Sequence, residues 1–149
     1  MNQPIQQRVL VDLDGTLALT GHRHHFVAGE DKNWKAFFAA CVDDQPNDDV
    51  IQVVRMLSIS YPITVVTGRS AEVMDQTISW LHQYGVPYAD IIMRAEGDYT
   101  PDHELKQRWA IEYNWNRDSI LCVLEDRDQV VKMWRSLGLT CMQVAEGNF

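Results

Sequence analysis

The sequence is poor in cysteine and contains no long apolar run. Its three cysteines, Cys41, Cys122 and Cys141, are widely spaced and form no Cys-x-x-Cys pair, which argues against a disulfide framework and against a zinc site of that kind. No apolar stretch approaches the roughly 20 residues that a membrane-spanning helix needs. The first ten residues, MNQPIQQRVL, lack the basic and apolar regions of a secretory signal. We therefore expect a cytoplasmic protein with reduced thiols and no membrane contact.

Positive charge is also scarce. The 149 residues include 13 Lys and Arg against 21 Asp and Glu, which gives a formal net charge of -8. A protein that coats nucleic acid through many phosphate contacts needs a basic surface, so this mode of binding is excluded. A local cluster of arginines can still hold a single phosphorylated end.

Two kinds of apolar pattern alternate along the chain and predict one α/β domain that covers residues 1–149. Short β-branched runs predict strands that begin at Arg8 and at 62–69, 89–94, 119–126 and 139–144. Helices are expected at 33–42, 46–60, 71–85, 101–113 and 128–138. We expect Asn47 or Asp48, Ser70 and Thr100 to cap helices, and Gly85 and Gly138 to end them. The alternation gives right-handed βαβ units, so we predict a three-layer Rossmann-like fold with a mostly parallel central sheet.

Polar side chains stand where the predicted strands end. The strand ends carry Asp12 and Asp14, then Thr67, Gly68 and Arg69, then Arg94, and finally Glu125 and Asp126. Ligands bind at the carboxyl ends of parallel strands, so we expect these residues to converge on one site. Turn chemistry explains Asp14 and Gly15 but leaves Asp12 without a reason. Two close carboxylates repel one another unless a cation compensates, so a metal site is the first hypothesis.

The order of these residues resembles the motifs of the haloacid dehalogenase-like phosphatase superfamily. Asp-x-Asp-Gly-Thr stands at 12–16, a threonine at 67, a helical lysine at 106 and an acidic pair at 125–126. Within that superfamily the chain is most similar to the phosphatase domains of bacteriophage polynucleotide kinase/3′-phosphatases. The likeness rests on DLDGTLA, Arg23, TGR at 67–69, RAEGDYTPDHELK at 94–106 and the segment from Glu125 to Phe149. No Gly-x-x-x-x-Gly-Lys-Ser/Thr loop occurs, so we expect no kinase half in this chain.

The resemblance implies a role for each matching residue. Asp12 would be the nucleophile and Asp14 the general acid and base. Thr67 and the backbone at Gly68 would bind a phosphoryl oxygen, and Lys106, oriented by Asp102, would neutralise charge on the phosphoryl group and on Asp12. Arg23, Arg69 and Arg94 would contact the substrate. Without the family pattern, Arg94 is as well explained by a surface ion pair.

The resemblance also implies Mg²⁺ as the cofactor. Its ligands would be Asp12, the backbone carbonyl of Asp14 and Asp126. Glu125 departs from the more usual second aspartate, and which acid of the pair touches the metal directly is left open, with Asp126 preferred. The histidines at 22, 24 and 25 do not have the spacing of a tetrahedral zinc site and are expected in a substrate-facing or solvated loop.

The superfamily inserts its cap between the first two motifs, and here that insertion, about 20–46, is short. Its aromatic residues Trp34, Phe37 and Phe38 are expected to form core, with stacking on a base as the alternative. A minimal cap leaves the site open and favours a nucleic-acid end over an enclosed metabolite.

We expect a Mg²⁺-dependent phosphatase that removes a 3′-phosphate from DNA or RNA ends, with 2′,3′-cyclic phosphates as further substrates and a separate kinase or ligase as partner. The alternatives are a small-molecule nucleotidase or acid phosphatase with the same chemistry, and a non-catalytic phosphate-binding domain.

Overall fold

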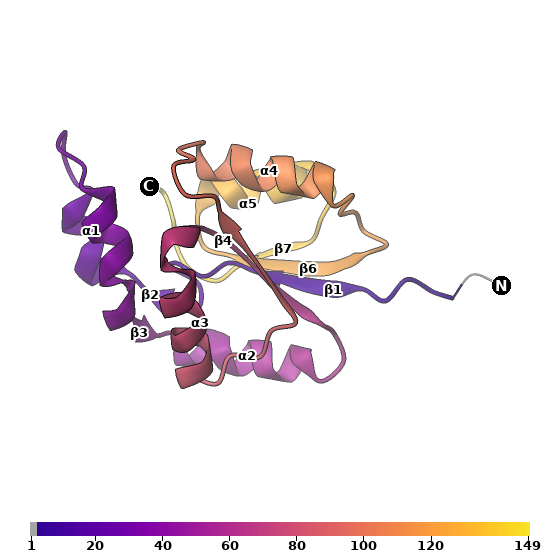
Figure 1. The fold of residues 1–149 in the computed structure, drawn as a ribbon. Helices are drawn as coiled ribbons and strands as arrows, with labels where there is room; N and C mark the ends of the chain where they lie inside the picture. Colours follow the sequence, from indigo (N-terminus) through magenta and orange to yellow (C-terminus); the bar gives the residue numbers. More distant parts are fainter. Residues whose placement is uncertain (1–2) are drawn as a thin grey trace.

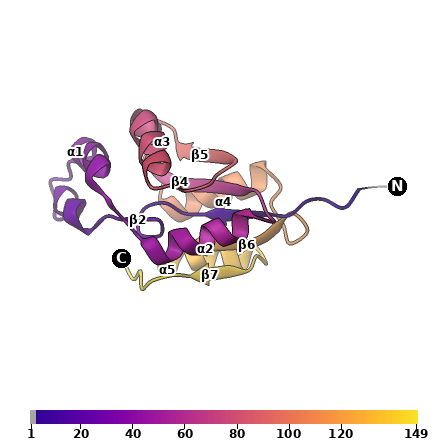
Figure 2. The same cartoon turned by 90° about the horizontal axis from the view of Figure 1, so that it is seen from below.

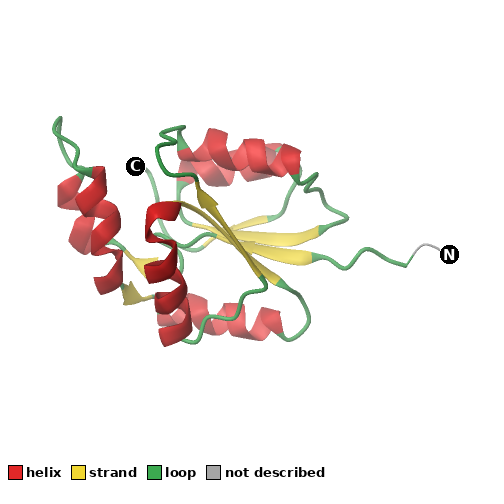
Figure 3. Ribbon diagram, viewed as in Figure 1, coloured by secondary structure: helices red, strands yellow, loops and turns green. Residues whose placement is uncertain are grey.

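A five-stranded parallel sheet forms the centre of the molecule (Figures 1 and 3). The computed structural model describes residues 3–149. The strands are β1 (Arg8–Val11), β4 (Ile63–Ser70), β5 (Asp90–Arg94), β6 (Ile120–Glu125) and β7 (Cys141–Gln143), in the order β5-β4-β1-β6-β7. All four neighbouring pairs are parallel. β1 therefore lies in the middle of the sheet, between β4 and β6.

Helices cover both faces of this sheet (Figures 1 and 2). They are α2 (Asp48–Ser58), α3 (Met74–Gln83), α4 (Asp102–Glu112) and α5 (Asp128–Ser136), and α3 is preceded by the 3-10 turn Ala71–Val73. Successive β1 side chains point to opposite faces: Val9 and Val11 pack in the core under α2 and α3, whereas Leu10 packs in the core under α4 and α5. The predicted three-layer α/β fold is confirmed.

The segment between β1 and α2 lies beyond the carboxyl ends of the strands (Figure 1). It contains the 3-10 turns Gly21–Phe26 and Ala40–Asp43, and the short helix α1 (Trp34–Ala39). A two-stranded antiparallel ladder of β2 (Ala18–Leu19) and β3 (Gln45–Pro46) holds its two ends together. The sequence did not indicate this ladder, because each strand has only two residues.

The structure agrees with some of the predicted helix ends and differs at others. Ser70 accepts a hydrogen bond from the backbone nitrogen of Glu72, as expected of a cap, and Gly85 follows α3 with a φ of 62°. Thr100 was wrongly predicted as a cap: Pro101 is the cap residue before α4, and the Thr100 hydroxyl donates to Asp98 Oδ1 instead. Asn47 precedes α2 but uses its side-chain amide to bind the carbonyl of Thr16. Within residues 3–149, no helix is both long and apolar enough to cross a membrane.

Candidate active site

The turn after β1 places Asp12 and Asp14. The Leu13 carbonyl accepts hydrogen bonds from the backbone nitrogens of Thr16, Leu17 and Ala18, so the chain reverses tightly beyond Asp12. Gly15 has a φ of 84°, in the left-handed region that favours glycine. A Cβ at Gly15 would also lie 2.1 Å from Asp126 Oδ2. Glycine is therefore required here both for the backbone angle and for the close approach of the Asp126 carboxylate.

Lys106 binds three carboxylates. Its Nζ donates to Asp12 Oδ1 at 2.8 Å and to Glu125 Oε2 at 2.9 Å, and it lies 3.2 Å from Asp102 Oδ2, one turn earlier on α4. The ammonium is fully buried, which by itself lowers the pKa of Lys106, but the charges of Asp102, Asp12 and Glu125 outweigh burial and hold that pKa well above its usual value. Lys106 is therefore a permanent cation beside Asp12.

One ammonium does not neutralise the acids around it. Asp12, Glu125 and Asp126 are buried and offer oxygen atoms within 4.8 Å of one another. Burial, followed by the charge of Asp12, raises the pKa of Asp126 to about 7. Burial, followed by the charge of Glu125, likewise raises the pKa of Asp12 well above its usual value. Three crowded carboxylates with raised pKa values form a set of oxygen ligands that can hold a metal ion, and a hard cation such as Mg²⁺ fits it.

The two acids of the 125–126 pair face different partners. Glu125 Oε2 accepts from Lys106, and its Oε1 accepts from the backbone nitrogen of Asp126 at 3.1 Å. Asp126 Oδ1 accepts only a weak bond from Thr16 Oγ1, at 3.3 Å, and Asp126 lines the pocket. This geometry supports Asp126 as the direct metal ligand and Glu125 as the residue that holds Lys106.

Asp14 is held by two arginines. Arg23 Nη2 donates to Asp14 Oδ1 at 2.8 Å, and Arg69 Nε and Nη2 donate to the same oxygen. Burial raises the pKa of Asp14, but the charges of Arg69 and then Arg23 outweigh it and lower that pKa below its usual value. In this arrangement Asp14 is ionised at neutral pH.

Asp44 completes this cluster and was missed in the sequence. It is 1% exposed, and its two carboxylate oxygens accept from Arg23 Nε and Nη2 at 2.8 Å each, in a bidentate pair. Arg69 Nη2 lies 3.1 Å from Asp44 Oδ2, and His22 Nε2 lies 2.7 Å from Oδ1. A buried arginine requires a carboxylate partner, but nothing in the spacing of the sequence identifies Asp44 among the acids of the 20–46 insertion.

Arg23 and Arg69 therefore lie behind Asp14. Both are fully buried, and neither is among the residues that line the pocket. Their guanidinium groups bind Asp14, Asp44, the Phe37 carbonyl and the Thr77 hydroxyl. Their predicted contact with the substrate phosphate stays a prediction.

Arg94 fastens the end of β4 to the loop before α4. Its Nε donates to the Gly68 carbonyl at 2.7 Å, and its Nη1 donates to the carbonyls of Asp98 and Thr100. Arg94 Nη2 lies 3.6 Å from Asp102 Oδ1, a buried oxygen that accepts no hydrogen bond from the described residues. A Cβ at Gly68 would lie 2.1 Å from that same oxygen, so only glycine allows Asp102 to reach its place beside Lys106.

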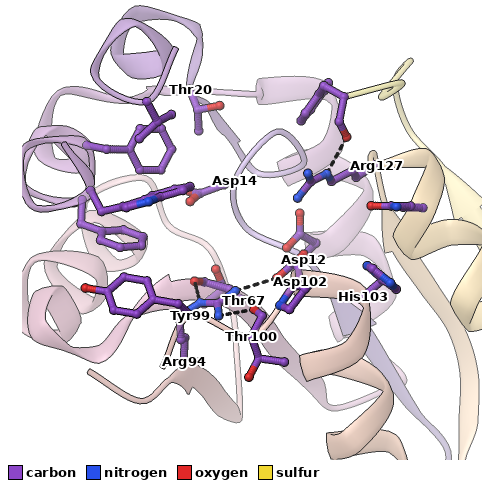
Figure 4. Close-up of a pocket in the computed structure, with 18 of the residues that line it drawn as sticks. Asp12, Asp14, Thr20, Thr67, Arg94, Tyr99, Thr100, Asp102, His103 and Arg127 are labelled. Carbon is purple, nitrogen blue, oxygen red and sulfur yellow. Dashed lines mark hydrogen bonds and ion pairs between the residues drawn. The ribbon is translucent and has the colours of Figure 1, made fainter. Parts of the chain in front are cut away.

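These groups open into a pocket of about 590 Å³ (Figure 4). It is lined by eight of the predicted residues: Asp12, Asp14, Thr67, Gly68, Arg94, Asp102, Glu125 and Asp126. Lys106 reaches the site from behind, through its contact with Asp12. The Thr67 hydroxyl accepts from the backbone nitrogen of Arg69, which leaves its own proton free to be donated into the pocket. Sequence reasoning did not single out Tyr99, Arg127 or Phe149, which also line it.

Comparison with known proteins gives a consistent result. The family model of the polynucleotide kinase PNKP phosphatase domain matches residues 6–149. The chain is 30% identical over 132 residues, 87% of its length, to a putative bifunctional polynucleotide kinase/RNA ligase of Autographa californica nuclear polyhedrosis virus. It covers only 18% of that viral protein.

Solved structures show the same relationship. A chain of the Pnkp1/Rnl/Hen1 RNA repair complex matches with a TM-score of 0.83 and 29% identity, over 99% of this chain and 45% of the other. A haloacid dehalogenase-like hydrolase from Streptococcus pneumoniae matches with a TM-score of 0.63 and 15% identity, over 93% of this chain and 84% of the other, which shows the shared fold. The chain thus spans less than half the length of the relatives whose sequences it resembles most among these.

Proposed function

Because the chain belongs to the family of the polynucleotide kinase PNKP phosphatase domain, we propose that it removes 3′-phosphates from DNA or RNA ends with the help of Mg²⁺. The resemblance to haloacid dehalogenase-like phosphatases is thereby confirmed at the level of the family, and the chain is a phosphatase domain. The observation that carries the finer proposal is the contact of Lys106 with Asp12 at the bottom of an open pocket that Asp14 also lines.

Asp12 is the nucleophile in this proposal. One of its carboxylate oxygens attacks phosphorus, the bond from phosphorus to the 3′ oxygen breaks, and an aspartyl-phosphate forms. Lys106 lowers the pKa of Asp12, against burial and the charge of Glu125, which raise it, and so favours the ionised carboxylate. The Thr67 hydroxyl donates to a phosphoryl oxygen, where charge accumulates during the transfer.

Asp14 moves the proton. It gives a proton to the departing 3′ oxygen, then takes one from the water that attacks the aspartyl-phosphate and releases inorganic phosphate. Its low pKa in the arginine cluster must rise for the first step. A dianionic phosphate next to Asp14 raises that pKa by like-charge repulsion, so substrate binding itself favours the protonated acid.

The metal ligands in this proposal are the side chains of Asp12 and Asp126 and the backbone carbonyl of Asp14. When bound there, Mg²⁺ supplies positive charge at the phosphoryl oxygens. Glu125 stands behind these ligands and, through Lys106, fixes the position of Asp12.

The relatives and the open pocket support a nucleic-acid end as the substrate. The viral relative is named a putative bifunctional polynucleotide kinase/RNA ligase, and the structural relative is a chain of an RNA repair complex. We therefore propose that this chain also works beside a kinase or ligase on broken nucleic-acid ends. The short segment that carries α1 leaves the pocket accessible to a polymer end.

The test is phosphate release with Mg²⁺ from a 3′-phosphorylated oligonucleotide, its 5′-phosphorylated counterpart, and 3′- and 5′-mononucleotides. We expect the 3′-phosphorylated oligonucleotide to be the best substrate, and Asp12→Asn and Asp14→Asn to abolish its turnover. Asp90→Asn, which changes an exposed acid paired with Arg8, should leave the rate unchanged. Better turnover of mononucleotides would make the protein a nucleotidase, and no turnover of any phosphomonoester would leave a binding domain.

A further inference from the structure

Tyr99 stands exposed at the edge of the pocket on a turn that is held rigidly. Tyr99 is 75% exposed, although it lines the same pocket as Asp12. Arg94 Nη1 donates to the carbonyls of Asp98 and Thr100, the residues on either side of it. Asp98 Oδ1 accepts from both the backbone nitrogen and the hydroxyl of Thr100, and Arg108 binds Asp98 Oδ2 at 2.7 Å. These hydrogen bonds fix the backbone of the turn, while the Tyr99 ring itself stays exposed.

A second aromatic surface, Trp34 and Phe37 of α1, lines the pocket as well. The two rings meet edge to face at 5.6 Å, and both pack on Phe38, which is buried. Trp34 is 37% exposed, and Phe37 is half-buried. Lys32 Nζ lies over the Trp34 ring, 5.8 Å from its centroid, so a cation stands over one face of this ring.

Both aromatic surfaces are on the Asp14 side of the pocket: Arg23 binds both Asp14 and the Phe37 carbonyl, and Figure 4 places Tyr99 on the same side. Figure 4 shows Tyr99 and Asp14 on one side of the pocket and His103 and Arg127 on the other. In the proposed mechanism Asp14 protonates the 3′ oxygen, so the nucleoside must extend past Asp14 and away from Asp12. The pocket volume of about 590 Å³ is in the range that encloses a whole small molecule, which leaves room for a nucleoside beside the phosphate.

We propose that Tyr99 and the Trp34–Phe37 surface hold the base of the 3′-terminal nucleotide between them. This inference rests on the proposed function and names the part of the substrate that the site recognises. Stacking on aromatic rings accepts every base, so the site selects an unpaired end and not a sequence. Because the Tyr99 turn is already ordered by Arg94 and Asp98, little conformational freedom is lost when a base binds.

The test measures affinity separately from turnover. The protein carries Asp12→Asn, and its dissociation constants are measured by calorimetry, with Mg²⁺ present, for a 3′-phosphorylated dinucleotide and for the same molecule with an abasic 3′ residue. We expect loss of the base to weaken binding about tenfold, as stacking energies predict. Tyr99→Ala should reduce this difference, because one of the two aromatic surfaces is lost, and Tyr99→Phe should keep it. Tyr113→Ala should also keep it, because Tyr113 is a 51% exposed tyrosine that does not line the pocket.

The outcomes separate this inference from the proposed function. Equal affinity for the two ligands, a base effect that is undiminished in Tyr99→Ala, or no measurable binding of either ligand would overturn the base site. The wild-type protein is assayed in parallel for phosphate release from the 3′ end. A base effect without phosphate release would support the base site while rejecting the 3′-phosphatase proposal.

Discussion

Lys106 is the residue on which the charge balance of the site depends. Lys106→Met would leave the buried Asp12 and Glu125 and the partly buried Asp102 without the only ammonium that contacts them among the described residues. We expect the free energy of unfolding at pH 7 to fall by about 3–5 kcal/mol, because one partner of a buried ion network is removed. Activity should fall about 100-fold or more, since the positive charge beside Asp12 and the phosphoryl group is lost and the pKa of Asp12 rises further.

Urea unfolding in EDTA and steady-state rates with Mg²⁺ measure the two effects of Lys106→Met. Lys132→Met is the matched control, because Lys132 is an exposed lysine on α5. A Lys106→Met protein as stable as the control would contradict the buried network.

Asp126 makes the stability of the metal-free protein depend on pH. Its pKa is raised to about 7 in the fold, mainly by burial and then by Asp12, so ionisation opposes folding. The stabilising effect of the protonated form is complete below the unfolded pKa of about 4 and is lost as the pH rises towards 7. We expect the melting temperature in EDTA to fall between pH 5 and pH 8. Added Mg²⁺ should raise it more at pH 8 than at pH 5, because metal ligands must be deprotonated.

Thermal unfolding at the two pH values, with and without Mg²⁺, checks this expectation. Asp126→Asn should flatten the pH dependence and reduce the stabilisation by Mg²⁺. The same Mg²⁺ shift at both pH values in the wild type would be inconsistent with binding to these carboxylates.

For single residues, the sequence indicated most members of the site but few of the hydrogen bonds and ion pairs between them. Asp12 and Asp126 could be predicted because each ends a strand, and Lys106 because it matches the helical lysine of the superfamily and stands one helical turn after Asp102. The contact of Asp102 with Lys106 could be predicted for the same reason. Asp44 could not, because it meets Arg23 and Arg69 only after the 20–46 segment has folded back onto the sheet.

The turn after β1 is an element whose geometry depends on one glycine. Gly15→Ala combines a positive φ with a Cβ 2.1 Å from Asp126 Oδ2, so the Asp126 carboxylate must move. We expect activity to fall about 100-fold, as a displacement of about 1 Å at a reacting site does. Stabilisation by Mg²⁺ should be lost as well, which thermal unfolding measures.

Gly29→Ala separates the contact from the backbone strain. Gly29 has a φ of 87°, close to that of Gly15, but a Cβ there meets no atom within 4 Å. Its substitution should lower the free energy of unfolding by about 1 kcal/mol and leave the rate unchanged. Equal rates for Gly15→Ala and Gly29→Ala would show that the Asp126 contact is unimportant.

The main elements could be predicted because their patterns are local. The β-branched run at 63–66 and the glycines at 85 and 138 are signals that need no tertiary contact. The β2–β3 ladder has no such signal, since Ala18 pairs with Pro46, which lies 28 positions further along the chain. The role of Thr100 was mistaken because Asp98, two residues earlier, competes for its hydroxyl.

The whole molecule carries a net charge of -8, and this limits how it meets a polyanion. The basic residues that line the pocket are Lys32, Arg94, Arg127 and the histidines at 24 and 103. If one terminal and one internal phosphate are bound, the logarithm of affinity should fall with the logarithm of salt at a slope of about -1.4. Longer oligonucleotides should gain little affinity, since the surface beyond the pocket is not basic overall.

KM values for 3′-phosphorylated trinucleotides and decanucleotides at several salt concentrations test this limit. A tenfold lower KM for the longer substrate, or a slope several times steeper, would point to an extended binding track instead.

The position of β1 between β4 and β6 also has a kinetic consequence. Hydrogen bonds of the site join Lys106 to Asp12 across 94 positions and Thr16 to Asp126 across 110. Contacts that close such long loops form late and slowly during refolding. Catalytic activity should therefore reappear after the helical signal of α2 to α5 has recovered, when both flanking strands have docked on β1. Recovery of activity would then mark the last step of folding.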